Sequence, residues 1–520
     1  MNFKISNTFT KELPADIELE NKRRQVYNAC FSFVTPKETS NPKLIHVSDE
    51  LCKELGITEK DAQTDEFVSL FTGNSVLDGT SPYAMCYGGH QFGHWAGQLG
   101  DGRAINLFEI NHNNKHLAFQ LKGAGETPYS RTADGLAVLR SSIREHLCSE
   151  AMHHLGVPTT RSLSLSLTGD EVLRDIMYNG NAAYEKGAVV CRVAPSFIRF
   201  GNFEIFASRK DHETLKKLAD YTIKYFYPEI NSSGKQKYLD FLTEVRNRTI
   251  DMIVHWQRVG FVHGVMNTDN MSILGVTIDY GPYGWLEGFD YEWTPNTTDA
   301  QNKRYRFGNQ PYIGMWNLYK LANALYPLIE EVEPLKAVLN EYETIYLAKY
   351  DAMMKQKLGL DIKNEHSSLI SELEKTLQLI ETDYTIFFRN LASVRQTDTS
   401  LEALGKVMDS FYNKEELNSS VKEKWLRWFD KYLQTIQKQN INDTERAVRM
   451  NSVNPKYVLR NYIAQLAIDE ADKGNYDVID ELYELLKQPY NEQPTYEKWF
   501  AKRPEWARHK VGCSMLSCSS

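Results

Sequence analysis

The residues best able to do chemistry are grouped in one loop, His263 to Asn270, and in the segment Asp279 to Gly281 that follows it. Asn270 and Asp279 offer hard oxygen atoms, which suit Mg²⁺ or Mn²⁺ when nucleotide phosphates and waters complete the shell. Asp269 is the only acid inside the loop, so it is the candidate base for a substrate hydroxyl. Alone, these residues would be turn formers. Together they predict a metal and nucleotide site.

The order of this loop is that of a kinase catalytic loop that lacks its base. Protein kinases use His-Arg-Asp, then an Asn that holds magnesium, then an Asp-Phe-Gly segment. The chain keeps the spacing from His263 to Asn270 and has Asp279-Tyr280-Gly281 downstream. Val265 occupies the position of the usual base, and valine cannot accept a proton. The loop therefore predicts ATP and metal binding with altered chemistry.

Lys122 closes an expected strand, and Glu145 lies on the helix expected after it. In kinases such a pair positions the phosphates of ATP, because the carboxylate orients the ammonium group. Without other evidence they would be a solvated lysine and an exposed glutamate. The kinase-like loop downstream favours the ion pair.

A glycine-rich segment, Gly97 to Arg103, precedes the first expected strand. Gly100 and Gly102 would let the backbone approach phosphates, and the Arg103 guanidinium could fork onto phosphate oxygens. The alternative is an ordinary turn.

Arg192 and Arg199 flank an apolar stretch near the end of the strand-rich half. Two arginines suit a phosphate better than an adenine ring. The alternative is a pair of surface arginines. If both face the cleft, the terminal phosphate of a nucleotide is buried there and the α-phosphate lies near Asp269. That orientation favours transfer of a nucleoside monophosphate over transfer of the γ-phosphate.

Hydrophobic periodicity places these residues on an α+β framework. Strands are expected at 104–110, 117–121, 163–167 and 188–193, with a helix carrying Leu136, Leu139, Ile143, Leu147 and Met152 between the second and third. Helices are expected at 214–225, 238–259, 316–329, 335–355, 369–379, 421–437 and 457–473. This order predicts a two-lobed, protein-kinase-like fold. We expect an irregular extension with short helices at 1–75, a β-rich lobe at 76–200, a helical lobe at 201–440 and a C-terminal extension at 441–520.

Composition narrows the function classes. The 520 residues carry a net charge of −8, which argues against nucleic acid as the main partner. The seven cysteines form no C-x-x-C pair, there is no apolar run long enough for a membrane, and the first residues lack the apolar core of a signal peptide. A soluble, cytoplasmic protein is predicted. Cys513 and Cys518 lie near the C-terminus, where a thiol is incidental or a redox group.

Several ordered stretches of the chain resemble the selenoprotein O family, known in bacteria as the YdiU group. The matching stretches are Gly89 to Gly93, Trp95 to Ala104, Gln120 to Gly125, Leu139 to Glu145, His263 to Asn270 and Cys518 to Ser520. The resemblance covers nearly the whole chain and implies a pseudokinase that binds ATP in an inverted orientation. It implies transfer of AMP, and in some bacterial members UMP, to Ser, Thr or Tyr hydroxyls of proteins.

The resemblance also implies roles for individual residues. The expected nucleotide contacts are Gly100, Gly102, Arg103, Lys122, Asp134, Gly135, Arg192, Arg199 and Asp279. Asp269 would accept the proton, Asn270 and Asp279 would bind the metal, and Glu145 would pair with Lys122. Leu136 stands where an Arg is common in the family, and Cys518 stands where some members carry selenocysteine. No cysteine lies between Cys191 and Cys513 to pair with the tail.

Two other functions stay open at this point. A kinase-like phosphotransferase acting on a small molecule or protein would move the γ-phosphate, and a nucleotide-binding scaffold would move nothing.

Overall fold

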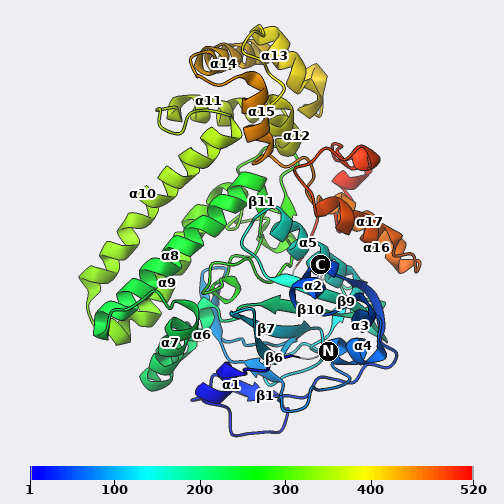
Figure 1. Ribbon diagram of the computed structural model, residues 1–520, viewed down its shortest axis with the longest axis vertical. Helices are drawn as coiled ribbons and strands as arrows, with labels where there is room; N and C mark the ends of the chain where they lie inside the picture. Colours follow the sequence, from blue (N-terminus) through cyan, green and yellow to red (C-terminus); the bar gives the residue numbers. More distant parts are fainter. Residues whose placement is uncertain (2, 178, 518–520) are drawn as a thin grey trace.

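The computed structural model describes residues 1, 3–177 and 179–517. Over these residues the chain is an α+β protein in which an antiparallel sheet is followed by a long series of helices (Figure 1). The sheet has the strand order β1-β3-β6-β7-β10-β9-β2, with β8 paired to β10. Its strands are β1 (Phe31–Phe33), β2 (Lys43–Val47), β3 (Tyr83–Met85), β6 (Ala104–His112), β7 (Lys115–Lys122), β8 (Ala137–Val138), β9 (Arg161–Arg174) and β10 (Ala183–Ala194).

The expected strands are confirmed, and the β6–β7 hairpin places Lys122. Its turn residues Asn113 and Asn114 both have positive φ, which suits the tight turns of right-twisted hairpins. Lys122 pairs with Ala104 on β6 and with Val190 on β10, so it lies at the end of a central strand.

The expected helix is α5 (Leu139–His154), and its surroundings differ from those predicted. It begins after Leu136, because Ala137–Val138 pairs with β10 as β8. From Leu139 to Met152 only Ser141 is not buried. The sheet packs against one side of the helix, and α16 (Asn461–Asp472) and α17 (Asp477–Leu486) pack against another. The C-terminal segment therefore encloses a helix that the sequence presented as amphipathic.

Residues 1–75 differ from the irregular extension that was expected, because β1 and β2 are strands of the main sheet. Short helices connect them to the rest: α1 (Thr8–Glu12), α2 (Asp49–Glu54), α3 (Glu59–Ala62) and α4 (Asp65–Thr72). A separate hairpin of β4 (Gly88–Gln91) and β5 (His94–Gln98) leads into the glycine-rich segment that ends at Arg103.

The helices after residue 200 flank the loop from His263 to Asn270, which lies between α8 and α9. They are α6 (Phe200–Ser208), α7 (His212–Phe226), α8 (Gly234–Val259), α9 (Gln310–Ile329) and α10 (Val332–Lys357). Helix α8 ends at Gly260, whose φ of 73° is the left-handed geometry that ends many helices. The chain then forms β11 (Phe261–Val262), which pairs with β12 (Gly284–Trp285), so the intervening loop is closed at its base.

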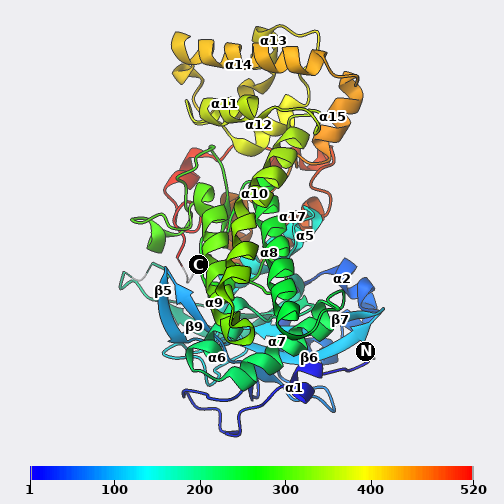
Figure 2. The ribbon, with the colours of Figure 1, turned by 90° about the vertical axis from the view of Figure 1, so that its left-hand side faces the viewer.

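Further helices stand away from the sheet, at the top of Figures 1 and 2: α11 (Ser367–Leu377), α12 (Tyr384–Leu391), α13 (Ser400–Val407), α14 (Ser419–Gln437) and α15 (Asp443–Asn451). None of the helices in the described part of the chain combines the length and apolar character that crossing a bilayer requires.

The C-terminal tail is packed rather than loose. Leu516 forms a bridge with Asn296, and the carbonyl of Cys513 accepts a hydrogen bond from Asn461. Burial raises the pKa of the free Cys513 thiol to about 11. The Cys513 thiol is therefore packed within the fold and is less acidic than a free cysteine. Cys518 lies outside the described residues.

Candidate active site

A cleft of about 570 Å³ brings the predicted residues together. It is lined by Gly100, Gly102, Arg103, Lys122, Asp134, Gly135, Arg192, Arg199, Asp269, Asn270 and Asp279. Glu145 stands behind the cleft wall and contacts it through Lys122. A larger cavity, of about 940 Å³, lies among α10, α14 and α15 and contains none of these residues. Chemistry, and not volume, therefore marks the first cavity as the candidate site.

The expected ion pair between Lys122 and Glu145 is confirmed. The Lys122 ammonium lies 2.5 Å from Glu145 Oε2, and the Arg192 guanidinium lies 3.0 Å from Oε1 of the same carboxylate. Burial lowers the pKa of Lys122, and Glu145 opposes that shift. One carboxylate thus orients two cations at the wall of the cleft.

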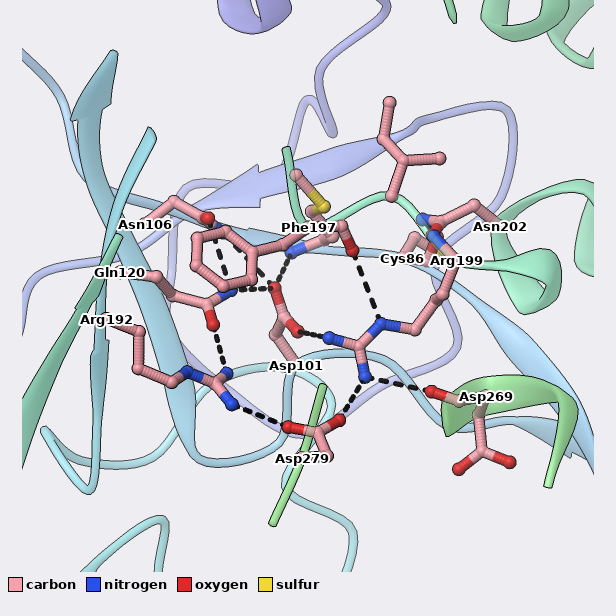
Figure 3. Close-up of polar contacts among 12 residues, drawn as sticks. Cys86, Asp101, Asn106, Gln120, Arg192, Phe197, Arg199, Asn202, Asp269 and Asp279 are labelled. Atoms are coloured by element: carbon pink, nitrogen blue, oxygen red, sulfur yellow. Dashed lines mark hydrogen bonds and ion pairs between the residues drawn. The ribbon is translucent and has the colours of Figure 1, made fainter. Parts of the chain in front are cut away.

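Asp279 is held between two arginines (Figure 3). Arg192 contacts its Oδ1 at 2.6 Å, and Arg199 donates to its Oδ2. Burial alone would raise the pKa of Asp279, but Arg199, Arg192 and Lys122 hold it well below its usual value. Its φ of 57° is rare for a residue other than glycine, and such strain is concentrated at functional sites.

A second layer holds these arginines, and sequence reasoning missed it. Gln120 accepts a hydrogen bond from Arg192, and the buried Asp101 lies 4.0 Å from Arg199 (Figure 3). Gln120 is two residues before Lys122 on β7, so both side chains are on one face of the sheet. That alternation was the available signal for Gln120. Asp101 had no signal, because its partner Arg199 is remote in the sequence.

Asp269 is buried, with 8% of its surface exposed. Gln91 Nε2 donates to its Oδ2 at 3.1 Å, whereas its Oδ1 has no hydrogen-bond partner among the described residues. Arg199 reaches the backbone carbonyl of Asp269 at 2.9 Å, and the carboxylate is directed away from that guanidinium (Figure 3). Burial raises the pKa of Asp269 to about 6, against the lowering effects of Gln91 and Arg199. One oxygen is therefore held by a hydrogen bond, and the other is buried near Gly89 without a polar partner.

The β4–β5 hairpin forms hydrogen bonds to the loop that contains Asp269. The His90 amide donates to Thr268 Oγ1 at 2.7 Å, and the Phe92 amide donates to Asn267 Oδ1 at 3.1 Å. A Cβ on Gly89 would lie 2.7 Å from Asp269 Oδ1, so a side chain there would displace the carboxylate. The sequence indicated only that this region is rich in glycine. Its contact with the loop, including that of Gln91, is a tertiary feature.

Asn270 and Asp279 have the chemistry of a divalent-cation site. The Asn270 side-chain nitrogen donates to the Val265 carbonyl at 3.0 Å, so its amide oxygen is left for another partner. Among the described residues no group of three or more His, Cys, Asp or Glu could hold a metal. A cation here would need Asn270, Asp279 and oxygen atoms of the nucleotide, which is the usual composition of a magnesium site. The residues present fit such an ion.

The glycine-rich loop is shaped by packing. A Cβ on Gly100 would lie 2.3 Å from the Tyr129 ring, and Gly100 has a φ of 74°. The amides of Asp101 and Gly102 already donate to the carbonyls of Met85 and Gly100. The loop therefore offers fewer free N–H groups for a phosphate than the sequence led us to expect.

Asp134 and Gly135 lie in the cleft beside an arginine that sequence reasoning missed. Arg174 pairs with both oxygens of Asp134, at 2.7 and 2.8 Å, and donates to the Leu136 carbonyl at 3.0 Å. Gly135 is pressed against Gly125, whose carbonyl would lie 2.1 Å from an added Cβ. Arg174 thus brings a guanidinium to the segment where Leu136 provides no charge.

Comparisons with known proteins name the family of the chain. The family model "Protein adenylyltransferase SelO" matches residues 15–487. The chain is 61% identical to "Protein nucleotidyltransferase YdiU" of Flavobacterium johnsoniae over 100% of both chains. It is 53% identical to the protein of that name from Rhodopirellula baltica, over 99% of each chain, and 52% identical to that of Aromatoleum aromaticum, over 100% of each.

The chain therefore belongs to the SelO family of protein adenylyltransferases. The resemblance found in the sequence and the prediction of an enzyme are both confirmed.

Proposed function

We propose that the protein transfers AMP from ATP to Ser, Thr or Tyr hydroxyls of other proteins, with the triphosphate bound terminal phosphate first. The observation that carries this proposal is the pair of buried arginines around Asp279. The names of the relatives, which are protein nucleotidyltransferases, support the reaction class.

Charge supports the inverted orientation. Lys122 and Arg192 share Glu145, Arg192 and Arg199 share Asp279, and Asp101 lies 4.0 Å from Arg199. Three cations thus meet at the buried inner part of the cleft, where phosphate oxygens are strong partners. An adenine ring would offer these cations no charged oxygen atoms. The terminal phosphates therefore occupy the inner end, and the α-phosphate lies toward Asp269.

Asp269 acts as the base in this proposal. Its carboxylate accepts the proton of the acceptor hydroxyl while the hydroxyl oxygen attacks the α-phosphorus. The bond between the α-phosphorus and its bridging oxygen breaks, and pyrophosphate leaves. Gln91 keeps Oδ2 fixed throughout. A pKa of about 6 leaves the carboxylate ionised at neutral pH and still basic enough to assist the transfer.

Asn270 and Asp279 would hold a Mg²⁺ or Mn²⁺ ion. Such an ion supplies positive charge to phosphate oxygens and orients them. Asp279 is now shared by two guanidiniums, so nucleotide phosphates that draw Arg192 and Arg199 toward themselves would free its carboxylate for the cation.

We also propose that the sheet and the helices from α6 onward are the two lobes of a kinase-like fold. The supporting observation is that the cleft is lined from both sides, by Lys122 and Arg192 of the sheet and by the loop that follows α8.

The test uses ATP labelled on either the α- or the γ-phosphate, with a protein acceptor and Mg²⁺. We expect the acceptor to gain α-label and the mass of one AMP, with no γ-label. UTP labelled on the α-phosphate, run in parallel, measures UMP transfer. Label from the γ-phosphate alone would establish a phosphotransferase and overturn the proposal. No label from either position, with ATP still bound in a calorimetric titration, would indicate a scaffold.

A further inference from the structure

An aromatic and cationic patch lies on the outer side of the hairpin that holds Asp269. We call it the Trp95 patch; it consists of Trp95, His90, Trp316, Arg304 and Lys320. Trp95 is 39% exposed, although tryptophan is usually mostly buried. The His90 ring lies 5.1 Å from the Trp95 ring and 5.5 Å from the Trp316 ring, so the three rings are contiguous.

Two cations extend the patch, Lys320 on α9 and Arg304 in the segment before that helix. The Arg304 guanidinium lies 4.6 Å from the centre of the Trp316 ring, and Lys320 Nζ lies 4.6 Å from the same ring. No carboxylate in the described part of the chain lies within 4.0 Å of either charged group.

The nearby acids are already occupied. Glu204 is buried and paired with His90. Asp299 accepts the backbone amides of Arg304 and Tyr305, at 2.9 and 2.7 Å. Each carboxylate is engaged within the fold, and Asp299 offsets only part of the Arg304 charge without contacting the guanidinium. The patch therefore presents positive charge and aromatic area to an approaching molecule, the residue types that dominate binding energy at protein interfaces.

The Trp95 patch is also next to the reacting group. His90 and Gln91 are consecutive in β4; the first donates to Thr268 and the second to Asp269. Strand β5 pairs only with β4 among the described strands, and it lies toward the left-hand side of Figure 2. An edge strand can accept an extended segment through backbone hydrogen bonds.

We propose that the Trp95 patch docks the acceptor protein as an extended segment that carries acidic residues beside the hydroxyl delivered to Asp269. This inference rests on the proposed function, because it needs a protein acceptor at that carboxylate. Arg304 and Lys320 select the flanking acids, Trp95 and Trp316 contact their aliphatic stems and backbone, and β5 holds the segment extended. None of the five patch residues lines the ATP cleft, so nucleotide binding should not depend on the patch.

The test compares two synthetic peptides of equal length, each with one Ser, one Thr and one Tyr, flanked either by Asp and Glu or by Lys and Arg. The readout is kcat/KM for transfer from α-labelled ATP. The wild-type enzyme is expected to prefer the acidic peptide by about tenfold, equivalent to about 1.4 kcal/mol. Lys320→Glu should lower that preference, and Arg304→Glu combined with Lys320→Glu should lower it further. The dependence of the preference on salt concentration should change in the opposite sense to that of the wild type. Trp95→Ala should raise KM for the acidic peptide, and Trp95→Phe should have a KM close to that of the wild type.

The matched control is Lys424→Glu, an exposed charge reversal on the distant helix α14. It should leave the preference unchanged, and all variants should bind ATP as the wild type does in a calorimetric titration. Equal labelling of both peptides, or a preference that survives both charge reversals, overturns the docking inference while the proposed function stands. Label only on the enzyme itself overturns it too. No α-label on any acceptor overturns the proposed function and the inference together.

Discussion

The cleft and the junction of β12 with α12 each bury a cluster of arginine and carboxylate groups, in opposite proportions. In the cleft, Asp279 is shared by Arg192 and Arg199, and its side chain is 21% exposed. At the junction, Arg460 is shared by Glu287 and Asp383, whose side chains are 7% and 0% exposed. Both clusters contain short ion pairs, and the first lines the cleft.

The difference lies in which groups are left over. At the junction, Tyr412 adds hydrogen bonds to both carboxylates, and Asp383 caps α12 through the Ile386 amide. The charged groups of this cluster are therefore paired with one another, and they connect the chain after β12 to the start of α12 and to Arg460. In the cleft, the ion-paired groups line an open cavity, and Asp269 Oδ1 has no partner among the described residues. A buried ion pair is thus weak evidence for function, whereas cations and an unpartnered carboxylate oxygen beside a cavity point to a substrate.

The largest effect on activity is expected from a change at Asp269. Asp269→Asn keeps the shape and the Gln91 contact but removes the base, so we expect transfer to fall about 10²- to 10⁴-fold. Affinity for ATP and the free energy of unfolding should change little. Initial rates with α-labelled ATP, calorimetry and chemical denaturation measure the three quantities. A loss of less than tenfold would remove Asp269 from the role of base.

The junction should show the reverse behaviour. Arg460→Met leaves Glu287 and Asp383 buried without their cation, which should lower the free energy of unfolding by about 3–5 kcal/mol. Activity per folded molecule, measured at low temperature, should be retained. Chemical denaturation followed by fluorescence gives the stability. A specific loss of transfer without loss of stability would mean that the two clusters do not differ as we argue.

Arg199→Met sharpens the proposed orientation of the nucleotide. Losing a charged hydrogen bond to the terminal phosphate costs about 1.5–3 kcal/mol, so the affinity for ATP should fall about ten- to hundredfold. AMP lacks that phosphate, and its affinity should stay unchanged. Titration calorimetry with ATP, ADP and AMP provides the measurement. An equal loss for ATP and AMP would place Arg199 at the nucleoside instead.

The smallest effect concerns pH. The base must be ionised, and a pKa of about 6 predicts that kcat/KM falls as the pH drops below about 6. The Gln91 hydrogen bond favours the ionised carboxylate, so Gln91→Ala should raise the pKa and move the acid limb upward by up to about one unit. Gln91→Glu, which adds a like charge, should move it further. Acid limbs that coincide in all three enzymes would show that Gln91 has no effect on Asp269.

Local sequence determined much of this protein. Four strands of the main sheet, the longer helices and the family were legible because hydrophobic period and motif order are local properties. The candidate residues were also found, since Lys122, Asp269 and Asp279 stand in ordered motifs. Local patterns could not show which elements pack against one another. The main sheet takes β1 and β2 from the first 75 residues, and α16 and α17 enclose α5.

Only the tertiary structure decided how the site is charged and held. Gln91 lies 178 residues before its partner Asp269, and Arg192 and Arg199 lie 87 and 80 residues before Asp279. Spacing along the chain carries no information about such contacts, because folding brings together side chains whose separation in sequence is arbitrary. The same holds for the pKa of Asp269, which depends first on burial, a property of the packed molecule. Residue type fixed what each group can do, and packing fixed which groups act together.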